Sequence, residues 1–250
     1  MTTTAAATPS ALLGWLDLVS TDIECSCEFL GELFAWHRFE RVQLDGIDYR
    51  ILGEGGVPIL GAEQIRPDQV PSRWTLFVVT DHIVGLLQRV LDAGGALSYP
   101  ATRLDEFGTI AMITDPAGST LGVWEARSLV PGSLHANVAP LVGARLTSPD
   151  PHATIEFLHQ TFAWELTSAA GSAAEVVGTL STGGAFAQVT AGGRGEWVPI
   201  FGLNRDLTGG QATAERIVAL GGTCAEASGG LWRATEPLGA EFLLTCSTQS

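Results

Sequence analysis

The sequence contains no lysine, so all thirteen of its basic residues are arginines. The lack of lysine excludes Schiff-base catalysis and the lysine grip of a P-loop on phosphate. The arginines form no cluster, and the formal net charge of the chain is -14. Nucleic acids and anionic membrane surfaces both require a basic face on their partner. The composition therefore excludes both kinds of partner.

Cysteine is scarce and long apolar runs are missing. None of the four cysteines forms a CxxC pair. Cys25 and Cys27 lie two positions apart on a predicted helix and so point to roughly opposite sides, which disfavours a zinc site or a local disulfide. The N-terminus lacks a basic n-region, and its apolar run is interrupted by Asp17 and too short to span a bilayer. These features predict a cytoplasmic protein.

Charged residues make up only 16% of the chain and apolar residues 46%, so each half can bury a core of its own. The chain is a tandem repeat. Residues 28–36 read EFLGELFAW, and residues 156–164 read EFLHQTFAW. A length of 250 residues suits two ordinary domains. We predict a first domain at 1–127, a linker at 128–140 and a second domain at 141–250.

Each half contains two copies of one pattern, a strand and a helix followed by three strands. Residues 15–19 alternate as a half-buried strand does, and Thr21-Asp22 supplies capping oxygens for the helix that follows. A second strand starts at Trp74, and the helix after it ends at Gly94-Gly95. Tight turns such as Asp115-Pro116-Ala117-Gly118 separate the short strands. Four such βαβββ modules predict an α+β fold with two curled, eight-stranded mixed sheets, each with a concave face.

This pattern resembles the vicinal oxygen chelate superfamily, which includes glyoxalase I, bleomycin-resistance proteins and extradiol dioxygenases. It is most similar to the tandem, two-domain actinobacterial branch, whose members open each domain with a GWxDLxTxD…FYxxLFGW-like phrase. The resemblance implies the four-module fold, and the superfamily hosts several chemistries as well as pure binders. The matching residues are Gly14, Trp15, Asp17, Leu18, Thr21, Asp22, Phe29, Leu33, Phe34 and Trp36, then Gly94, Gly95, Asp115, Pro116, Gly118, Gly122, Trp124 and Glu125.

The resemblance also implies where a metal would bind. Metal enzymes of the family place a histidine seven residues before the Asp that opens each helix, and a carboxylate seven residues after the Asp of the Asp-Pro-x-Gly turn. In this sequence the counted positions hold tryptophan, glycine, proline or leucine, whose side chains cannot coordinate a divalent cation. We therefore expect no metal and no other cofactor. The residues counted at these positions are Trp15, Trp74 and Gly122 in the first half and Gly143, Pro199 and Leu243 in the second.

The tryptophans that replace these ligands suggest a different use of the concave face. Trp15, Trp74 and Trp124 are predicted to project into the first cup, with Leu76 and Arg50 as further ligand contacts. Indole walls with one or two carboxylates suit a flat, largely aromatic ligand. The alternative is that the tryptophans simply fill a cup that binds nothing.

Asp17 is the candidate proton-transfer residue. Desolvation beside indole rings would raise its pKa and allow it to exchange a proton at neutral pH. Its candidate partners are Tyr49, His37 and Glu125, and His37 is the strongest functional candidate among the five histidines. The alternative interpretation of Asp17 is a solvated or helix-capping carboxylate.

The second half offers different residues at the matching places. Arg145 stands where the first half has Asp17, and Trp197 and Phe201 are further candidate ligand contacts. Gly143 opens space where the first half has an indole. A second, differently shaped pocket and a half that serves only as a scaffold are both left open.

These observations predict a metal-independent protein that binds a planar hydrophobic natural-product intermediate, polyketide-like or aromatic, and promotes its cyclisation or isomerisation by acid/base catalysis. The alternative is a non-catalytic protein that sequesters an antibiotic. A metal-dependent glyoxalase or dioxygenase is the minor alternative. A second copy of the chain is a further candidate partner.

Overall fold

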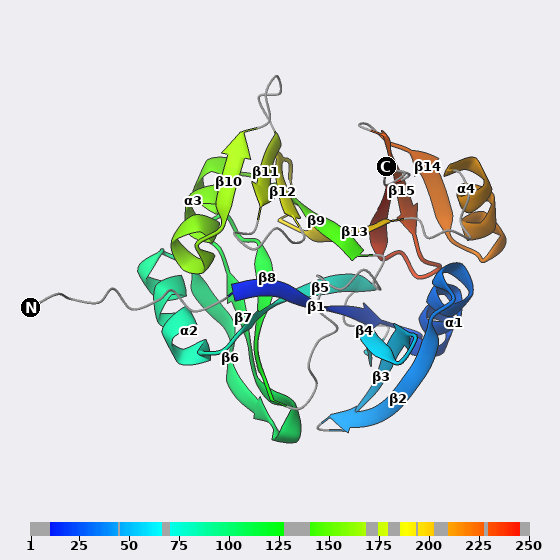
Figure 1. Ribbon diagram of the computed structural model, residues 1–250, viewed down its shortest axis with the longest axis horizontal. Helices are drawn as coiled ribbons and strands as arrows, with labels where there is room; N and C mark the ends of the chain where they lie inside the picture. Colours follow the sequence, from blue (N-terminus) through cyan, green and yellow to red (C-terminus); the bar gives the residue numbers. More distant parts are fainter. Residues whose placement is uncertain are drawn as a thin grey trace, which may run out of the picture.

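The computed structural model describes most of the chain, and its described residues form two eight-stranded sheets (Figure 1). One sheet comes from residues before the predicted linker and the other from residues after it. The linker itself lies outside the described residues, so the domain boundaries stay a prediction. The described ranges are 11–44, 46–66, 71–127, 141–168, 175–179, 186–193, 195–202, 210–227 and 230–245.

The first sheet and its two helices follow the predicted module order. Its elements are β1 (Ala11–Ser20), α1 (Ile23–Phe34), β2 (His37–Leu44), β3 (Ile47–Glu54), β4 (Val57–Gln64), β5 (Arg73–Thr80), α2 (Ile83–Asp92), β6 (Ala96–Leu104), a 3-10 turn η1 (Asp105–Phe107), β7 (Gly108–Thr114) and β8 (Thr120–Ala126).

The second sheet repeats this order. Its elements are β9 (Leu141–Ser148), α3 (Pro151–Phe162), β10 (Glu165–Ser168), β11 (Glu175–Thr179), β12 (Phe186–Ala191), β13 (Trp197–Gly202), α4 (Gly210–Ala219), β14 (Thr223–Glu226), β15 (Leu231–Thr235) and β16 (Glu241–Thr245). None of the helices in the described ranges is long and apolar enough to cross a membrane.

The two sheets have the same topology. The strand order is β2-β3-β4-β1-β5-β8-β7-β6 in the first and β10-β11-β12-β9-β13-β16-β15-β14 in the second. The central pairs β1–β5 and β9–β13 are antiparallel, whereas β1–β4, β5–β8, β9–β12 and β13–β16 are parallel. The mixed, four-module α+β architecture predicted from the sequence is confirmed.

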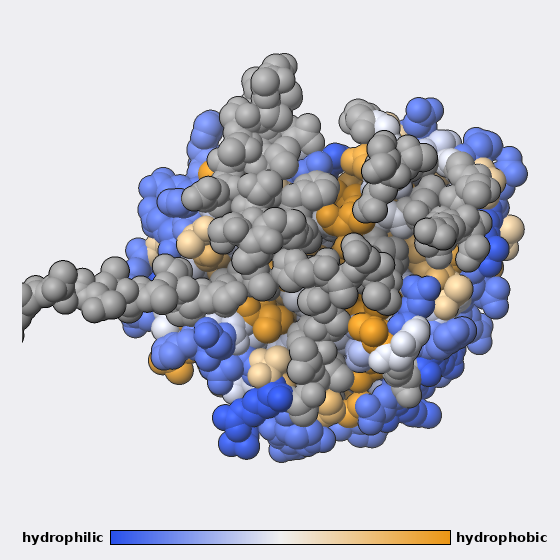
Figure 2. Space-filling model, in the orientation of Figure 1, coloured by the Kyte–Doolittle hydropathy of each residue, from blue (hydrophilic) through white to orange (hydrophobic). Residues whose placement is uncertain are grey.

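The sheets lie back to back, and each curls away from the other (Figure 1). Strands β5 and β13 contact one another at the junction, while α1 lies beside α4 and α2 packs against α3 at the flanks. The concave faces therefore open on opposite sides of the molecule. In Figure 2, hydrophobic residues gather toward the middle of the visible face and hydrophilic residues lie around its periphery.

The helices begin and end as their sequences dictate. Asp22 and Asp150 are the N-caps of α1 and α3, and each carboxylate accepts a hydrogen bond from the backbone N–H three residues later. Both helices end at an alanine in the left-handed conformation, with φ of 59° at Ala35 and 55° at Ala163. This reversal directs the next residue, Trp36 or Trp164, into the buried core.

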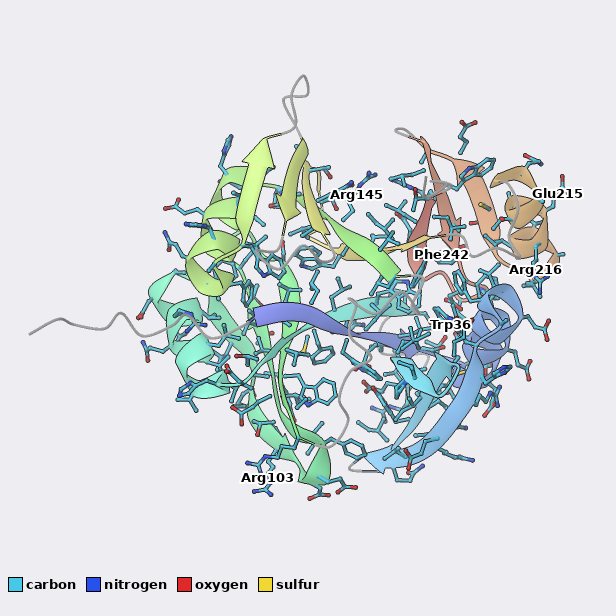
Figure 3. All side chains as sticks on the ribbon, in the orientation of Figure 1. Trp36, Arg103, Arg145, Glu215, Arg216 and Phe242 are labelled. Carbon is cyan, nitrogen blue, oxygen red and sulfur yellow. The ribbon has the colours of Figure 1, made fainter. Side chains whose placement is uncertain are left out.

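The core between the sheets is shared by the two halves, although each half was expected to bury a core of its own. Phe34 stacks on Trp36 with ring centroids 4.5 Å apart, and both rings contact Phe201 of the second half at 5.1 and 5.8 Å. Phe242 joins the same cluster (Figure 3). Because the aromatic layer comes from both halves, we expect neither half to keep its fold when separated from the other.

Two chains of buried hydrogen bonds also join the halves, and they are related by the repeat. Thr154 of α3 donates to Oδ2 of Asp115, at 2.8 Å, and its own oxygen lies 2.7 Å from the Ser148 hydroxyl. At the equivalent place, Ser26 of α1 donates to Oε2 of Glu236, at 3.0 Å, and lies 2.8 Å from the Ser20 hydroxyl. The acidic residue of each Asp/Glu-Pro-x-Gly turn thus anchors a helix of the other half.

Arginines on α2 and α4 add a second reciprocal pair of links. Arg89 donates from Nε to the carbonyl oxygen of Thr161, at 3.0 Å, and Arg216 donates to the carbonyl oxygen of Glu32 (Figure 3). Both pairs of links join the two halves and follow the same pseudo-symmetry.

Thr154→Val is expected to destabilise the whole protein by roughly 2 kcal/mol, since it leaves a buried carboxylate oxygen of Asp115 without its donor. Urea denaturation followed by circular dichroism measures the loss. Thr120→Val, an exposed threonine of β8, is the matched control and is expected to change stability by less than about 0.5 kcal/mol. Equal values for the two variants would show that the buried link contributes nothing.

Candidate functional site

The concave face of the first sheet holds a cavity of about 370 Å³. Its walls are mainly aromatic and aliphatic, with a few polar groups on one side, as is typical of small-molecule sites. The lining residues are Trp15, Asp17, Val19, Ile47, Tyr49, Ile51, Glu63, Arg73, Thr75, Phe77, Tyr99, Leu104, Phe107, Ile110, Met112 and Trp124.

Strand alternation places these side chains. Along β1, Trp15 and Asp17 face the cavity, while Leu16 and Leu18 belong to the core between the sheets. The neighbouring strand β5 pairs Thr75 with Asp17 in the antiparallel register. Residues directly opposite one another share a face, so the polar groups of the two central strands meet in the cavity floor.

Trp15, Asp17 and Tyr49 form a closed hydrogen-bonded group. Oδ1 of Asp17 accepts from the Tyr49 hydroxyl at 2.6 Å and from Nε1 of Trp15 at 2.7 Å. Nε1 of Trp15 also lies 3.1 Å from the Tyr49 oxygen. Both donors go to the same oxygen, and no described residue donates to Oδ2. Oδ2 is therefore the atom of Asp17 that can exchange a proton with a ligand.

Gly61 of β4 makes this group possible. Gly61 pairs with Asp17 across the parallel ladder, and a Cβ built on it would lie 1.7 Å from the Tyr49 oxygen and 2.5 Å from Oδ1 of Asp17. Only a residue without a side chain leaves room for the phenol to cross β4 and reach the carboxylate.

In the hydrogen-bonded group of Trp15, Asp17 and Tyr49, the pKa values of Asp17 and Tyr49 are both shifted. Burial raises the pKa of Asp17 from its ordinary 3.8 to about 7, although the hydrogen bonds from Tyr49 and Trp15 act in the opposite direction. Burial and the nearby Asp17 carboxylate raise the pKa of Tyr49 well above its ordinary range. Tyr49 therefore remains a donor, and Asp17 changes its charge near neutral pH.

Glu63 is a second carboxylate in the same cavity. It lies on β4 opposite Tyr49, and burial raises its pKa, an effect that the nearby Arg73 guanidinium partly offsets. No hydrogen bond or ion pair joins Glu63 to another described residue. Its negative charge also contributes to the raised pKa of Asp17.

Aromatic rings build another part of the cavity wall. Trp15 and Trp124 meet edge to face, with ring centroids 5.8 Å apart and an interplanar angle of 67°. Nε1 of Trp124 donates to the carbonyl oxygen of Phe107, at 2.8 Å, which fixes the indole in place. With its N–H satisfied by the protein, this indole offers a ligand an apolar face.

The residues at the family's metal positions do not fit a divalent cation. Trp15 and Gly122 do lie on the concave side, but an indole and a hydrogen atom supply no ligand. The Phe77 ring fills the space beside Gly122, where a Cβ would lie 2.3 Å from the ring. Within the described part of the chain, no group of three His, Cys, Asp or Glu side chains could hold a metal ion.

The structure corrects the predicted positions of Trp74 and Leu76, which lie in the core between the sheets and not in the cavity. Trp74 was placed in the cavity by counting back seven residues from Asp81. The N-cap of α2 is His82, one residue later, and counting back from it leads to Thr75. A shift of one residue along a strand moves a side chain to the opposite face.

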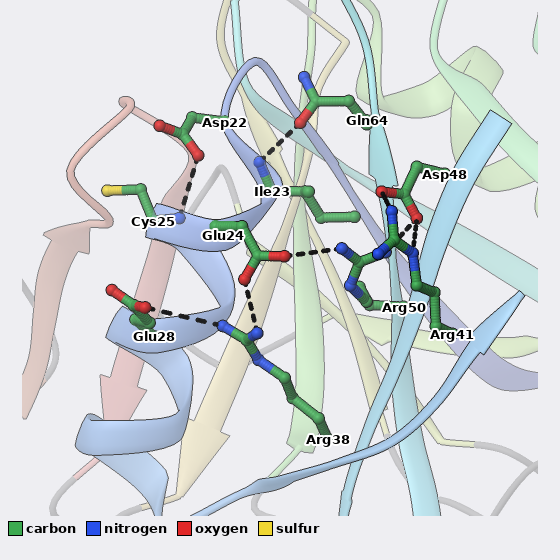
Figure 4. A network of polar contacts seen from close by, with 10 residues as sticks. All are labelled: Asp22, Ile23, Glu24, Cys25, Glu28, Arg38, Arg41, Asp48, Arg50 and Gln64. Carbon is green, nitrogen blue, oxygen red and sulfur yellow. Dashed lines mark hydrogen bonds and ion pairs between the residues drawn. The ribbon is translucent and has the colours of Figure 1, made fainter.

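Arg50 also lies outside the cavity. It follows Tyr49 on β3 and therefore points to the opposite face, where its guanidinium pairs with Glu24 of α1 and with Asp48 (Figure 4). The pair with Glu24 holds β3, the strand that carries Tyr49, against α1. The prediction that Arg50 contacts the ligand is wrong in position.

His37 and Glu125 are not brought to the cavity either. His37 is exposed at the start of β2. Glu125 faces away from its neighbour Trp124, and its Oε2 accepts from the backbone N–H of Ile83 at 2.9 Å. A carboxylate at a helix N-terminus is favourable there, so Glu125 stabilises the start of α2.

In the second half, Trp197 and Phe201 are buried in the shared core, because Val198 and Ile200 are the residues of β13 that face the concave side. Arg145 does lie on the concave side of β9, where Nε and Nη2 donate to Oε1 of Gln188 at 3.0 and 2.8 Å (Figure 3).

Several cavity residues were missed by the sequence reasoning. Strand alternation puts Glu63 on the same face of β4 as Gly61, and Phe77 on the same face of β5 as Thr75. Alternation alone could therefore have placed both residues on the cavity side once the face of each strand was known. The sequence contains no local signal for Tyr99, Phe107 or Met112, because they reach the cavity only through the curl of β6 and β7.

Comparisons with known proteins agree with this architecture. No protein-family model matches the chain. The chain is 25% identical over 217 residues to “Putative glyoxylase CFP32” of Mycobacterium tuberculosis, an alignment that covers 83% of this chain and 82% of the relative. It is 31% identical over 124 residues to the anthracycline biosynthesis protein DnrV of Streptomyces peucetius, covering 44% and 45% of the two chains.

Solved structures show the same fold at low sequence identity. The Mn(II)-bound glyoxalase of Novosphingobium aromaticivorans aligns with a TM-score of 0.67 at 12% identity, over 95% of this chain and 82% of that one. The 2,3-dioxygenase LapB of Pseudomonas sp. KL28 aligns with a TM-score of 0.66 at 11% identity, over 98% and 94%. The chain therefore has the fold of the vicinal oxygen chelate superfamily.

Proposed function

We propose that this protein binds a planar, hydrophobic aromatic or polyketide-like intermediate in the first cup and isomerises or cyclises it without a metal ion. Asp17 is the general acid/base, and Tyr49 holds it in place. The likeness to DnrV, a protein of anthracycline biosynthesis, supports a polycyclic aromatic ligand, although that alignment covers less than half of each chain.

The observation that carries this proposal is the asymmetric environment of the Asp17 carboxyl. Oδ1 accepts two hydrogen bonds, and no described residue donates to Oδ2. A carboxyl with a pKa of about 7 is present in both protonation states at neutral pH, which is the condition for efficient proton transfer in either direction.

The proposed step is an enolisation. Oδ2 of Asp17 takes a proton from a carbon that a carbonyl group makes acidic, either directly or through a conjugated ring. The electron pair of the C–H bond forms a new C=C bond, and the π pair of the carbonyl group moves to its oxygen to give an enolate. Protonated Oδ2 then returns the proton to another atom of the ligand, which completes an isomerisation with no net oxidation or reduction. Thr75 and Arg73 lie in the same cavity and are the groups available to stabilise the enolate oxygen.

Deuterium exchange into anthrone tests the proposal. Anthrone is a planar tricyclic ketone whose methylene hydrogens are acidic because loss of one gives an enolate conjugated through the rings. Their exchange with solvent deuterium is followed by mass spectrometry. We expect the protein to accelerate this exchange, and Asp17→Asn to reduce the acceleration by about a hundredfold or more while tryptophan-quenching affinity for anthrone changes less than about threefold.

The controls separate the alternatives. Trp124→Leu is expected to weaken anthrone binding about tenfold, whereas Trp74→Phe, in the core, should leave it unchanged. Binding of anthrone without faster deuterium exchange would favour the alternative function, a non-catalytic protein that sequesters its ligand. The mainly apolar wall of the cavity suits such a binder as well. A stoichiometric divalent metal ion in the purified protein would contradict the metal-independent reaction.

A further inference from the structure

Glu63 is a carboxylate that neither the fold nor the proposed proton transfer uses. It lines the cavity with Asp17, and in the described residues no donor or cation lies within hydrogen-bond or ion-pair distance of it. The Arg73 guanidinium offsets the cost of burying this carboxylate only in part, and a positively charged ligand group would offset the remainder.

The charges around Glu63 favour a cation. The ionisable residues that line the cavity are Asp17 on β1, Tyr49 on β3, Glu63 on β4, Arg73 on β5 and Tyr99 on β6. Arg73 is exposed, whereas both carboxylates are more buried, so the inner part of the cavity carries the negative charge. The net charge of -14 adds a negative field around the whole molecule.

The aromatic lining favours a cation for a second reason. The faces of indole, phenol and phenyl rings carry partial negative charge and attract cations in a desolvated site. Trp15, Trp124, Phe77, Phe107 and Tyr99 all line this cavity. A flat aromatic ligand could therefore stack on these rings while an amine on it approaches Glu63.

We propose that the ligand of this cavity is a planar aromatic compound that carries a cationic amine, and that Glu63 is the residue that recognises the amine. This inference rests on the proposed function, since it assumes that a planar ligand enters the first cup. Asp17 remains the proton-transfer residue, and the positive charge nearby would favour its ionised, basic form.

Two tricyclic probes of similar shape test the inference at pH 8. 9-Aminoacridine carries one positive charge, and acridone is neutral. We expect 9-aminoacridine to bind at least about tenfold more tightly than acridone, measured by isothermal titration calorimetry. Glu63→Gln should reduce this ratio to about twofold or less by weakening only the cation. Glu226→Gln, at an exposed residue of β14, is the charge-matched control and should leave the ratio unchanged.

The pH dependence supplies an independent readout. The affinity for 9-aminoacridine should fall as the pH is lowered from 8 to 5, because Asp17, with a pKa of about 7, takes up a proton and burial raises the pKa of Glu63 toward this range. The affinity for acridone should stay nearly constant. Equal affinity for the two probes, or an unchanged ratio in Glu63→Gln, would overturn the inference and leave the proposed function standing. Failure of both probes to bind would contradict the proposed function itself.

Discussion

Asp17→Asn is expected to stabilise the protein by roughly 4 kcal/mol at pH 8 and by almost nothing at pH 4. The pKa of Asp17 is about 7 in the folded protein and close to 3.8 in an unfolded chain. Between these values the folded protein keeps a proton that the unfolded chain has released. The free energy of unfolding of the wild type therefore falls as the pH rises from about 4 to about 7.

Asparagine at position 17 keeps the hydrogen bonds that the carboxylate of Asp17 accepts. Its carbonyl oxygen can still accept from Tyr49 and Trp15, as Oδ1 of Asp17 does, and it has no charge to bury. Thermal unfolding at both pH values measures the effect, and a rise of roughly 10 °C in Tm is expected at pH 8. Asp81→Asn, at an exposed residue just before α2, is the control for loss of one negative charge. A difference between wild type and Asp17→Asn that does not grow with pH would contradict the raised pKa.

This stability prediction bears on function as well. A residue whose replacement makes the protein more stable but inactive is typical of a functional site, where a buried charge is retained for its chemistry. We expect Asp17→Asn to be both the more stable and the catalytically silent variant. Higher stability together with lost exchange activity would show that the Asp17 carboxyl is retained for catalysis and does not stabilise the fold.

Gly61→Ala is expected to have the second-largest effect, weakening anthrone binding about tenfold and destabilising the protein by roughly 2 kcal/mol. The added methyl group would lie 1.7 Å from the Tyr49 oxygen and 2.2 Å from Cζ of the same ring. The phenol must move away, and Asp17 then loses its shortest hydrogen bond. Fluorescence titration and urea denaturation measure the two effects.

Gly193→Ala is the matched control, because a Cβ at Gly193 meets no atom within 4 Å. In a Tyr49→Ala background, Gly61→Ala should cost less stability than in the wild type, since the ring that obstructs the methyl group is gone. If the two substitutions were additive, the effect of Gly61 would not pass through Tyr49, and our account of this glycine would be wrong.

Much of the architecture could be predicted from local sequence signals. The caps at Asp22 and Asp150, the two Asp/Glu-Pro-x-Gly turns and the repeated EFL…FAW phrases each lie within one module, so they specify helices, turns and strands without reference to the rest of the chain. Alternation along β1 also placed Trp15 and Asp17 on one face, and the structure has them on the cavity side.

The contents of the cavity depended on tertiary structure. Tyr49 reaches Asp17 only because β4 lies between their strands and presents a glycine at that point. The face of β5 was assigned wrongly because the seven-residue count started from Asp81, whereas the residue that caps α2 is His82, and Trp74 thus lies in the core. Strand register is set by contacts between distant segments, which no local pattern contains.

By itself, the sequence determined the class of this protein: a tandem α+β fold with no lysine chemistry and no family metal ligands at the counted positions. Only the tertiary structure decided which residues share the cavity, because the pairing of β1, β3 and β4 and the curl of β6 and β7 bring Asp17, Tyr49, Glu63 and Tyr99 together. It also decided that the halves share one core, since the aromatic layer between the sheets forms only when both are present.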